Sequence, residues 1–258
     1  MDIEGKRVIV TAGGGGIGSE VVRLFSDAGA KVFICDIDES ALNSIISKYD
    51  NVSGLLADVS NPEEFSAFFG KADDYLGGLD IMVNNAGTAG PTALIEEISL
   101  DDWHKCIDTN LTSAFLGTQL AIPRIKTSDN MGGSIVNLSS AAGKFGFPLR
   151  SPYSAAKWAI VGLTRTTALE VGKYKIRCNC IQPGPVEGDR IDRVIKAKAK
   201  AEGVSENRKR DEIMSGTTLH TFIPQEHIAG MIFYLCSEAG RTITGQAISV
   251  DGGLESVL

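Results

Sequence analysis

The sequence predicts an α/β protein, a single doubly wound parallel sheet of about seven strands with helices on both faces. Short apolar runs alternate with amphipathic stretches from one end of the 258 residues to the other. Several of these runs are apolar on both faces, which is typical of parallel strands that helices cover on both sides. The 29 glycines exceed the usual share of ~7%, and they suit the many tight turns of such a fold.

Each strand and each helix can be placed along the chain. The apolar runs predict strands over residues 6–12, 31–36, 52–58, 80–85, 134–139, 176–182 and 247–251. Helical periodicity between them predicts helices over residues 17–28, 39–48, 62–75, 101–124, 152–172 and 225–237. Gly29 after the first helix and Asn61-Pro62 before the third are end and start signals. No long polar linker divides the chain, so we expect residues 1–258 to form one domain.

One segment interrupts this alternation. Residues from about 185 to 222, which follow the sixth strand, are rich in Lys, Arg, Asp and Glu. Ligands of such sheets bind at the carboxyl ends of the strands, and the segment begins at one of those ends. We therefore expect a substrate lid there, slightly basic in an otherwise acidic chain.

Composition excludes several classes of function. The net charge of −7 argues against a nucleic-acid-binding surface. Uncharged apolar stretches fall short of the ~18 residues that span a membrane, so no membrane partner is expected. The five cysteines and three histidines lack the spacing of a metal site, so no metal is expected. Cysteines within apolar runs and a charged N-terminus favour a cytoplasmic location.

A glycine-rich turn, TAGGGGIG over residues 11–18, joins the first strand to the first helix. A helix N-terminus offers unpaired N–H groups to a pyrophosphate, and glycines let the phosphate approach the backbone. The register is open, because Gly13, Gly15 and Gly18 fit GxGxxG, while Gly16 and Gly18 fit the end of GxxxGxG. Asp36 ends the second strand, where its carboxylate can accept from the adenosine ribose and would repel a 2′-phosphate. NAD is therefore favoured over NADP as the cofactor.

Ser140, Tyr153 and Lys157 form the candidate catalytic group. Tyr153 and Lys157 lie four residues apart and so share a helix face. An ammonium ~5 Å from a phenol stabilises the phenolate by roughly 3 kcal/mol at an effective dielectric near ~20. The phenol can then act as a general acid and base near neutral pH. Ser140 follows a strand and can donate a hydrogen bond to the oxygen on which charge changes.

With these residues in order, the sequence resembles the classical short-chain dehydrogenase/reductase family over nearly all of its length. The motifs that carry the resemblance are the glycine turn with Ile17-Gly18, Asp58-Val59, Asn84-Asn85-Ala86-Gly87, Asn110 in DTNL, the group of Ser140, Tyr153 and Lys157, Pro183-Gly184, and Thr244-Gly245-Gln246 with Val250-Asp251-Gly252-Gly253. The resemblance implies a Rossmann-type fold, a nicotinamide dinucleotide cofactor, a small-molecule substrate and a homotetramer.

The resemblance also implies roles for the motif residues. Tyr153 exchanges the proton, and Ser140 positions the substrate oxygen. Lys157 lowers the Tyr153 pKa and binds the nicotinamide ribose, while Asn110 holds a water of the proton relay. The residues expected to contact the cofactor are Gly14, Gly15, Gly16, Ile17, Gly18, Asp36, Ile37, Asp58, Val59, Asn85, Ala86, Gly87, Tyr153, Lys157, Pro183, Gly184 and Val186.

Two residues depart from the family pattern. Ala12 stands where the family usually has its first glycine, and we expect its Cβ to be tolerated through a negative φ. Gly188 stands where the family commonly has a Thr that helps to hold the nicotinamide carboxamide. The anchoring of that carboxamide is therefore left open.

The sequence thus predicts an NAD-dependent oxidoreductase that transfers a hydride between nicotinamide and a secondary alcohol or ketone, with a polar or acidic substrate. Arg190 or Arg193 of the lid could pair with an anionic substrate, although the nearly balanced charges of the lid also fit a solvated helix. Phe145, Phe147 and Arg150 are expected to line the substrate mouth. The alternatives are a 3-oxoacyl thioester reductase using NADPH, a dinucleotide-sugar epimerase, and a non-catalytic dinucleotide-sensing protein.

Overall fold

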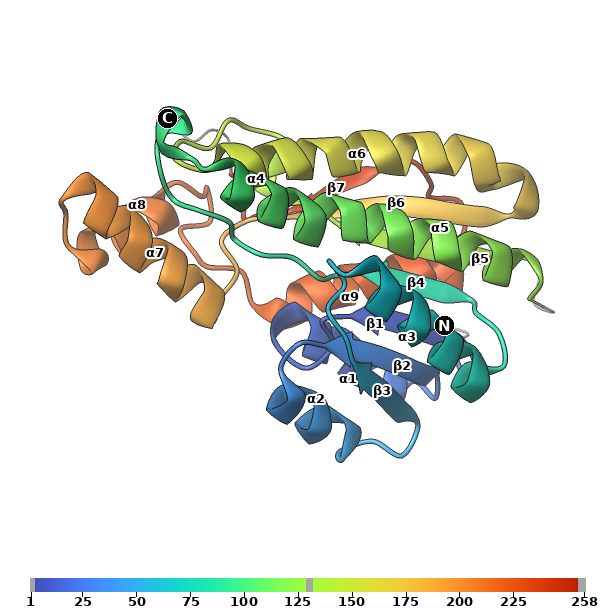
Figure 1. Ribbon diagram of the computed structural model, residues 1–258. Helices are drawn as coiled ribbons and strands as arrows, with labels where there is room; N and C mark the ends of the chain where they lie inside the picture. The colour runs from blue at the N-terminus through green and yellow to red at the C-terminus, as the bar shows by residue number, and fades with distance from the viewer. Residues whose placement is uncertain (1–2, 129–131, 255–258) are drawn as a thin grey trace.

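The computed structural model describes residues 3–128 and 132–254 of the chain (Figure 1). In this part of the chain, seven parallel strands form one sheet in the order β3-β2-β1-β4-β5-β6-β7. The strands are β1 (Arg7–Thr11), β2 (Lys31–Asp36), β3 (Val52–Leu56), β4 (Ile81–Asn84), β5 (Gly133–Leu138), β6 (Ile176–Pro183) and β7 (Ala247–Val250). The predicted doubly wound parallel sheet is confirmed, and each strand ends within two residues of its predicted limits.

Helices cover both faces of the sheet (Figure 1). One face carries α1 (Gly16–Asp27), α2 (Glu39–Ile46) and α9 (Gln225–Cys236). The other carries α3 (Pro62–Leu76), α5 (Ser113–Lys126) and α6 (Ser151–Val171). Beside α6 lies α4 (Leu100–Ile107). Short 3₁₀ turns lie at Ile95–Glu97, Ala141–Gly143, Gly172–Tyr174 and Glu238–Gly240.

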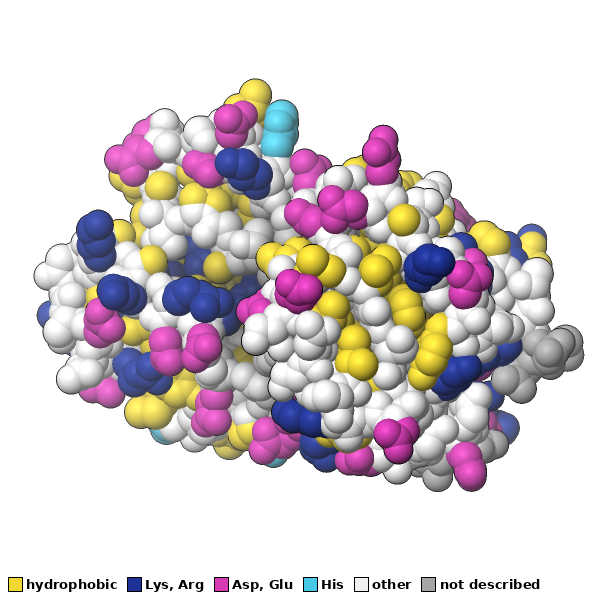
Figure 2. Space-filling model, turned by 60° about the horizontal axis from the view of Figure 1, so that its bottom comes forward, with side chains coloured by type: hydrophobic (Ala, Val, Ile, Leu, Met, Phe, Trp, Pro, Cys, Tyr) yellow, Lys and Arg dark blue, Asp and Glu magenta, His cyan; other side chains and the backbone are white. Residues whose placement is uncertain are grey.

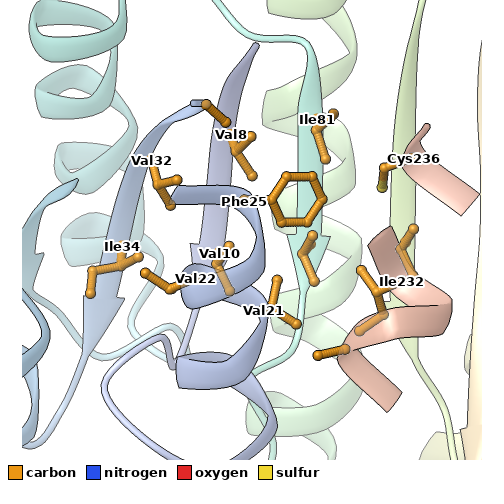
Figure 3. Close-up of a cluster of buried hydrophobic side chains, with 14 of the residues drawn as sticks. Val8, Val10, Val21, Val22, Phe25, Val32, Ile34, Ile81, Ile232 and Cys236 are labelled. Atoms are coloured by element: carbon orange, nitrogen blue, oxygen red, sulfur yellow. The ribbon is translucent and has the colours of Figure 1, made fainter. Parts of the chain in front are cut away.

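The two cores explain why the central strands are apolar on both sides. Val8 and Val10 of β1 point to one face, where they pack with Phe25 of α1 and Ile232 of α9 (Figure 3). Ile9, between those two valines, belongs to the opposite core, where the phenylalanines of α3 lie. Burial on both faces leaves no position for a charged side chain on β1 after its first residue, Arg7.

A π-helical turn (Asp108–Thr112) divides the predicted helix of residues 101–124 into α4 and α5. The widened turn holds Asn110, whose side chain is buried. Such turns are frequent at functional sites, because they re-aim a side chain without ending the helix. Apolar periodicity did not reveal the turn, since the residues on both sides of it keep helical spacing.

The segment from 185 to 222 contains two helices, α7 (Asp189–Glu202) and α8 (Glu206–Ser215). Figure 1 shows them packed together beyond one end of the sheet. A bridge between Val186 and Ile223, with the Glu187 N–H donating to the Ile223 carbonyl (3.0 Å), closes the base of the segment. The segment therefore leaves and rejoins the fold at one narrow neck after β6.

A set of hydrogen bonds ties β1 to β4 where the order of the strands reverses. Thr11 Oγ1 accepts from the N–H groups of Asn85 (3.0 Å) and Ala86 (2.9 Å). The Asn85 side chain donates to the carbonyls of Thr11 and Ala12, both at 3.0 Å. In doubly wound sheets, ligands bind in the crevice at this reversal, so these bonds hold the floor of the candidate site.

Candidate functional site

The glycine turn presents a helix N-terminus with no side-chain cap. Gly15 precedes α1 and offers no side chain, and the first turn of α1 holds no acidic residue. A Cβ built on Gly15 or Gly16 would meet no other heavy atom within 4 Å, so the backbone is open on that side. Unpaired N–H groups and the positive end of the helix dipole stabilise an anion such as a pyrophosphate in this position.

The other glycines of the turn allow close packing. A Cβ on Gly14 would lie 2.9 Å from Asp36 Oδ2, and one on Gly18 would lie 2.0 Å from the Ala12 carbonyl oxygen. Ile17 packs against the core beneath the turn. Gly14 and Gly18 are therefore needed for the shape of the turn, while Gly15 and Gly16 leave it open to a ligand.

The expectation of a negative φ at Ala12 is wrong. Its φ is +51°, in the left-handed region that favours glycine. The hydrogen bond from Asn85 to the Ala12 carbonyl holds this peptide in place. The chain thus keeps the backbone shape of a glycine at residue 12 while carrying a Cβ there.

Asp36 lies at the carboxyl end of β2, beside the turn. Its carboxylate accepts from the N–H groups of Gly14 (2.9 Å) and Asp38 (3.1 Å). Each carboxylate oxygen can accept a further hydrogen bond. Ile37, the next residue, is 74% exposed, and Asp38 and Glu39 follow it. Three carboxylates within four residues make this end of the crevice negative, which suits a ribose hydroxyl better than a phosphate.

Asp58 and Val59 follow β3, and Gly87 follows β4. The Asp58 carboxylate accepts from the Ser60 N–H (2.8 Å) and hydroxyl (2.7 Å), and Val59 is buried. A Cβ on Gly87 would lie 2.7 Å from Asn110 Oδ1 and 3.5 Å from Lys157 Nζ. Gly87 therefore lies directly against two of the predicted catalytic residues.

The structure brings Ser140, Tyr153 and Lys157 together. Lys157 Nζ lies 5.5 Å from the centroid of the Tyr153 ring and donates to the Leu138 carbonyl (2.7 Å). Ser140 lies two residues after the end of β5. It accepts from the Ala142 N–H (3.2 Å) and hydrogen-bonds the Tyr153 hydroxyl. The carboxyl end of β5 and the first turns of α6 thus position all three groups.

The electrostatics of the site favour proton exchange. Burial raises the pKa of Tyr153, but the charges of Arg190 and Lys157 act against it. Together with the Ser140 hydrogen bond and Arg150, they hold the pKa of the phenol below its usual value of 10. Burial also lowers the pKa of Lys157 to about 8, although the Tyr153 charge opposes this shift. The two pKa values therefore move toward the physiological range.

Asn110 carries a buried oxygen without a hydrogen-bond partner in the described part of the chain. Its Nδ2 donates to the carbonyls of Cys106 (2.8 Å) and Thr88 (3.1 Å), which fixes the amide. Its Oδ1 accepts no hydrogen bond, which costs about 1–3 kcal/mol for a buried polar group. A water between Asn110 and Lys157 would satisfy this atom.

Pro183, Gly184 and Val186 follow the sheet at the neck of the 185–222 segment. Pro183 ends β6, and the Gly184 N–H donates to the Val250 carbonyl (3.1 Å). A Cβ on Gly184 would lie 2.7 Å from the Asp251 Cα, so only glycine fits between these strand ends. Pro183 and Gly184 therefore lie at the carboxyl ends of β6 and β7.

Gly188 has a physical reason to differ from the family's Thr. Its φ is +118°, and a Cβ there would lie 2.6 Å from Gln225 Nε2. Gln225 in turn donates to the Glu187 carbonyl (2.8 Å). A Thr at this position would displace that hydrogen bond as well as strain the backbone.

Two arginines lie beside the catalytic group. The guanidinium carbon of Arg150 is 5.0 Å from the Tyr153 ring centroid, and that of Arg190 is 5.7 Å from it. Arg190 also donates to the Gly87 carbonyl (3.3 Å), whereas Arg193 is exposed on the same helix. The sequence placed Arg150 only at the substrate mouth. Arg150 directly precedes α6, and its helical spacing from Tyr153 and Lys157 is the signal for this closer contact.

Figure 2 shows Lys and Arg side chains gathered in a hollow between the α7–α8 part of the molecule, at left, and the rest of the fold. Among residues 3–128 and 132–254, no helix is long and apolar enough to cross a membrane. Over the same residues, no group of three or more His, Cys, Asp or Glu side chains is arranged to hold a metal ion.

Comparisons with known proteins agree with this geometry. The family described as Enoyl-(Acyl carrier protein) reductase matches residues 11–255. The D-beta-hydroxybutyrate dehydrogenase of Rhizobium meliloti is 34% identical over 257 residues, covering 96% of this chain and 98% of the relative. The 3-oxoacyl-[acyl-carrier-protein] reductase FabG of Thermotoga maritima is 31% identical over 258 residues, covering 98% and 99%.

A solved structure is similar over nearly its whole length. The actinorhodin polyketide ketoreductase, in a variant crystallised with NADPH, superposes with a TM-score of 0.92 at 29% identity. The match covers 97% of each chain. These similarities cover the glycine turn, the catalytic group and the 185–222 segment together.

Proposed function

Because the chain belongs to the classical short-chain dehydrogenase/reductase family, we propose that it transfers a hydride between NAD and a secondary alcohol or its ketone. The family makes it an oxidoreductase that uses a nicotinamide dinucleotide and acts on CH–OH or keto groups. The proposal adds the choice of NAD and a polar or acidic substrate. The observation that carries it is the grouping of Ser140 and Lys157 around Tyr153, next to Gly87.

Tyr153 exchanges the proton with the substrate. Its hydroxyl donates to the carbonyl oxygen during reduction, and its phenolate accepts the alcohol proton during oxidation. Ser140 Oγ donates to the same oxygen and stabilises the charge that develops on it. A bound nicotinamide dinucleotide accepts or supplies the hydride.

Lys157 and Asn110 keep Tyr153 ready for the next turnover. The Lys157 ammonium stabilises the phenolate, and its pKa of about 8 lets it exchange a proton near neutral pH. The unpartnered Asn110 Oδ1 supports a water site that leads the proton away from Lys157. In this scheme Tyr153 and Ser140 touch the substrate, while Lys157 and Asn110 act through Tyr153.

The residues of the crevice fit a dinucleotide without a 2′-phosphate. The open backbone at Gly15 and Gly16 supports pyrophosphate binding, and Asp36 supports the ribose hydroxyls. A 2′-phosphate would lie against Asp36 with Asp38 and Glu39 nearby, and it would be repelled by all three. Cofactor contacts of Asp58, Val59 and Ala86 are proposed on the family resemblance.

A 3-oxoacyl thioester reductase using NADPH is the second candidate. The similarity to a 3-oxoacyl-[acyl-carrier-protein] reductase and to a ketoreductase crystallised with NADPH favours it. The acidic end of β2 is the observation that opposes it. The cofactor preference therefore separates the two candidates directly.

The proposal is tested by a screen of secondary alcohols, polyols and hydroxy acids with NAD and with NADP. The readout is the absorbance of the reduced cofactor. We expect oxidation with NAD, and a loss of kcat of about 10²–10⁴ in Tyr153→Phe with NAD affinity retained. Tyr174→Phe, which alters an exposed tyrosine, is the matched control. Retained turnover in Tyr153→Phe would contradict the mechanism, and faster reduction of 3-oxoacyl thioesters with NADPH would establish the second candidate.

We further propose a cytoplasmic location and a homotetramer. All five cysteines are free and buried, which fits a reducing compartment. The tetramer is expected from the family resemblance.

A further inference from the structure

The Tyr153 ring lies among three cations. Arg150, Lys157 and Arg190 place their charged groups 5.0, 5.5 and 5.7 Å from its centroid. The charges that shift the pKa of Arg150 are those of Tyr153, Arg190 and Cys106, and none of these groups is a carboxylate. Because like charges held this close repel one another, the cluster is a site that an anion would stabilise.

Arg150 is buried in this cluster without an acidic partner. Its side chain is 4% exposed, and its Nη2 donates to the Ala89 carbonyl. Its Nε is buried and donates to no group in the described part of the chain. A single carbonyl could be bound by a neutral side chain, so this contact does not account for a buried guanidinium.

The backbone before Arg150 is also strained. Leu149 has φ +64°, a left-handed conformation that a branched side chain rarely adopts. The Ala93 N–H donates to its carbonyl (3.1 Å) and holds it there. This conformation turns the chain so that Arg150 enters the site at the start of α6, and such strain is typical of functional positions.

Arg190 approaches the same place from the 185–222 segment. It lies in the first turn of α7, where the helix dipole disfavours a cation. Its bond to the Gly87 carbonyl spans the crevice instead of pairing with the acidic residues of its own helix. Lys198, further along α7, stacks on Phe147 at 5.3 Å and adds to the same positive field.

We propose that Arg150 and Arg190 together bind the carboxylate of the substrate, which makes short hydroxy acids and the matching oxo acids the substrate class. This inference rests on the proposed function, because it places the carboxylate relative to the oxygen that Tyr153 protonates. A carboxylate bound to a guanidinium lies about 2.8 Å from its nitrogens. Since both guanidinium groups face the ring that carries the reacting hydroxyl, only a few bonds separate the carboxylate from the reacting carbon, as in 2- and 3-hydroxy acids.

The test compares 2- and 3-hydroxybutyrate, as both enantiomers, with their methyl esters, which keep the chain and hydroxyl but lose the charge. The wild type is expected to oxidise one acid with a kcat/KM at least tenfold above that of its ester. Arg150→Met should raise the KM of the acid about 10- to 100-fold, the cost of a lost charge-assisted contact, and leave that of the ester unchanged. Arg150→Lys should restore part of the difference.

Two controls separate substrate binding from a structural role. Lys196→Met removes one charge from an exposed position on α7 and should change neither KM. In the wild type, butyrate should inhibit ester oxidation competitively while butyramide should not, a readout that needs no variant to fold. An equal rise in KM for acid and ester in Arg150→Met, or inhibition by inorganic phosphate but not by butyrate, would overturn the carboxylate assignment.

The outcomes also distinguish this inference from the proposed function. If other secondary alcohols are oxidised with NAD but acids and esters react equally well, the carboxylate site is wrong and the proposed function stands. If no secondary alcohol is oxidised with either cofactor, the proposed function itself fails.

Discussion

The two carboxylate oxygens of Asp36 each accept a backbone hydrogen bond, and the two bonds stabilise different segments. Asp36 holds the glycine turn through the Gly14 N–H and orders the start of α2 through the Asp38 N–H. Each carboxylate oxygen keeps capacity for a further hydrogen bond, and we propose that the ribose hydroxyls use it. Recognition of the cofactor and the shape of the turn therefore depend on one side chain.

Asp36→Asn tests the cofactor assignment at this residue. The amide oxygen can still accept from the Gly14 N–H, but the negative charge that repels a 2′-phosphate is removed. We expect the ratio of kcat/KM for NAD over NADP to fall about 10- to 100-fold, since hydrogen bonds to charged groups contribute about 1.5–3 kcal/mol.

Glu39→Gln is the control for that substitution, because it removes one charge from the same segment at an exposed position that starts α2. It should change the ratio far less. An unchanged ratio in Asp36→Asn would show that another part of the site selects the dinucleotide.

Residue chemistry was predictable where the spacing along the chain fixes it. Tyr153 and Lys157 lie on consecutive turns of one helix, so their contact follows from their separation of four residues. Arg190 reaches Tyr153 only through the fold of residues 185–222. The unpartnered Asn110 oxygen likewise depends on burial by segments far away in the chain. No local sequence pattern predicts either the contact of Arg190 with Tyr153 or the lack of a partner for the Asn110 oxygen.

The elements follow the same rule. Strands β1 and β2 are buried on both faces, so the ends of the apolar runs in the sequence predict the ends of the strands to within one residue. The turn between β1 and α1 was recognisable from its glycines, but its backbone angles were not. Ala12 adopts a positive φ because Gly18 and Asn85 pack against its carbonyl group, an effect of tertiary structure.

Ala12→Gly should therefore stabilise the turn. The left-handed conformation costs an L-residue about 1–2 kcal/mol. Glycine avoids this cost, but it loses about 0.5–1 kcal/mol of stability because its unfolded chain is more flexible than that of alanine. We expect the free energy of unfolding to rise by about 0.5–1 kcal/mol, measured by urea denaturation without dinucleotide.

Ala67→Gly is the matched substitution at an exposed position inside α3, where the backbone is helical. It should lower the free energy of unfolding by about 0.5–1 kcal/mol. If both variants were destabilised equally, the strain at Ala12 would have no energetic consequence.

At the scale of the whole molecule, large apolar side chains remain exposed on the layer formed by α4, α5 and α6 (Figure 1). Leu100 and Leu169 are 68% and 87% exposed, and Phe115 and Trp158 are 44% and 52% exposed. Large apolar side chains left exposed on one layer indicate a candidate protein interface. It supports the proposed association of several chains through this layer, which the family resemblance alone led us to expect.

Light scattering should accordingly give a mass of four times 27.4 kDa. Phe115→Glu combined with Leu169→Glu should reduce that mass, because charges would be buried unpaired at the interface. Leu219→Glu, at an equally exposed leucine outside this layer, should leave the mass unchanged. A wild-type mass of one chain would contradict the proposed assembly.

The π-helical turn at Asp108–Thr112 places a limit on how this chain can vary in length. Such a turn carries one residue more than a regular α-helical turn, so deleting one residue there would leave a regular helix in which the later residues keep their faces. Gly117 would still face Asn84, where a Cβ at residue 117 would lie only 2.1 Å from the Asn84 oxygen. The position that the turn gives to Asn110 would be lost. Loss of a single residue there should therefore impair the proposed proton relay while leaving the packing of α5 on the sheet intact.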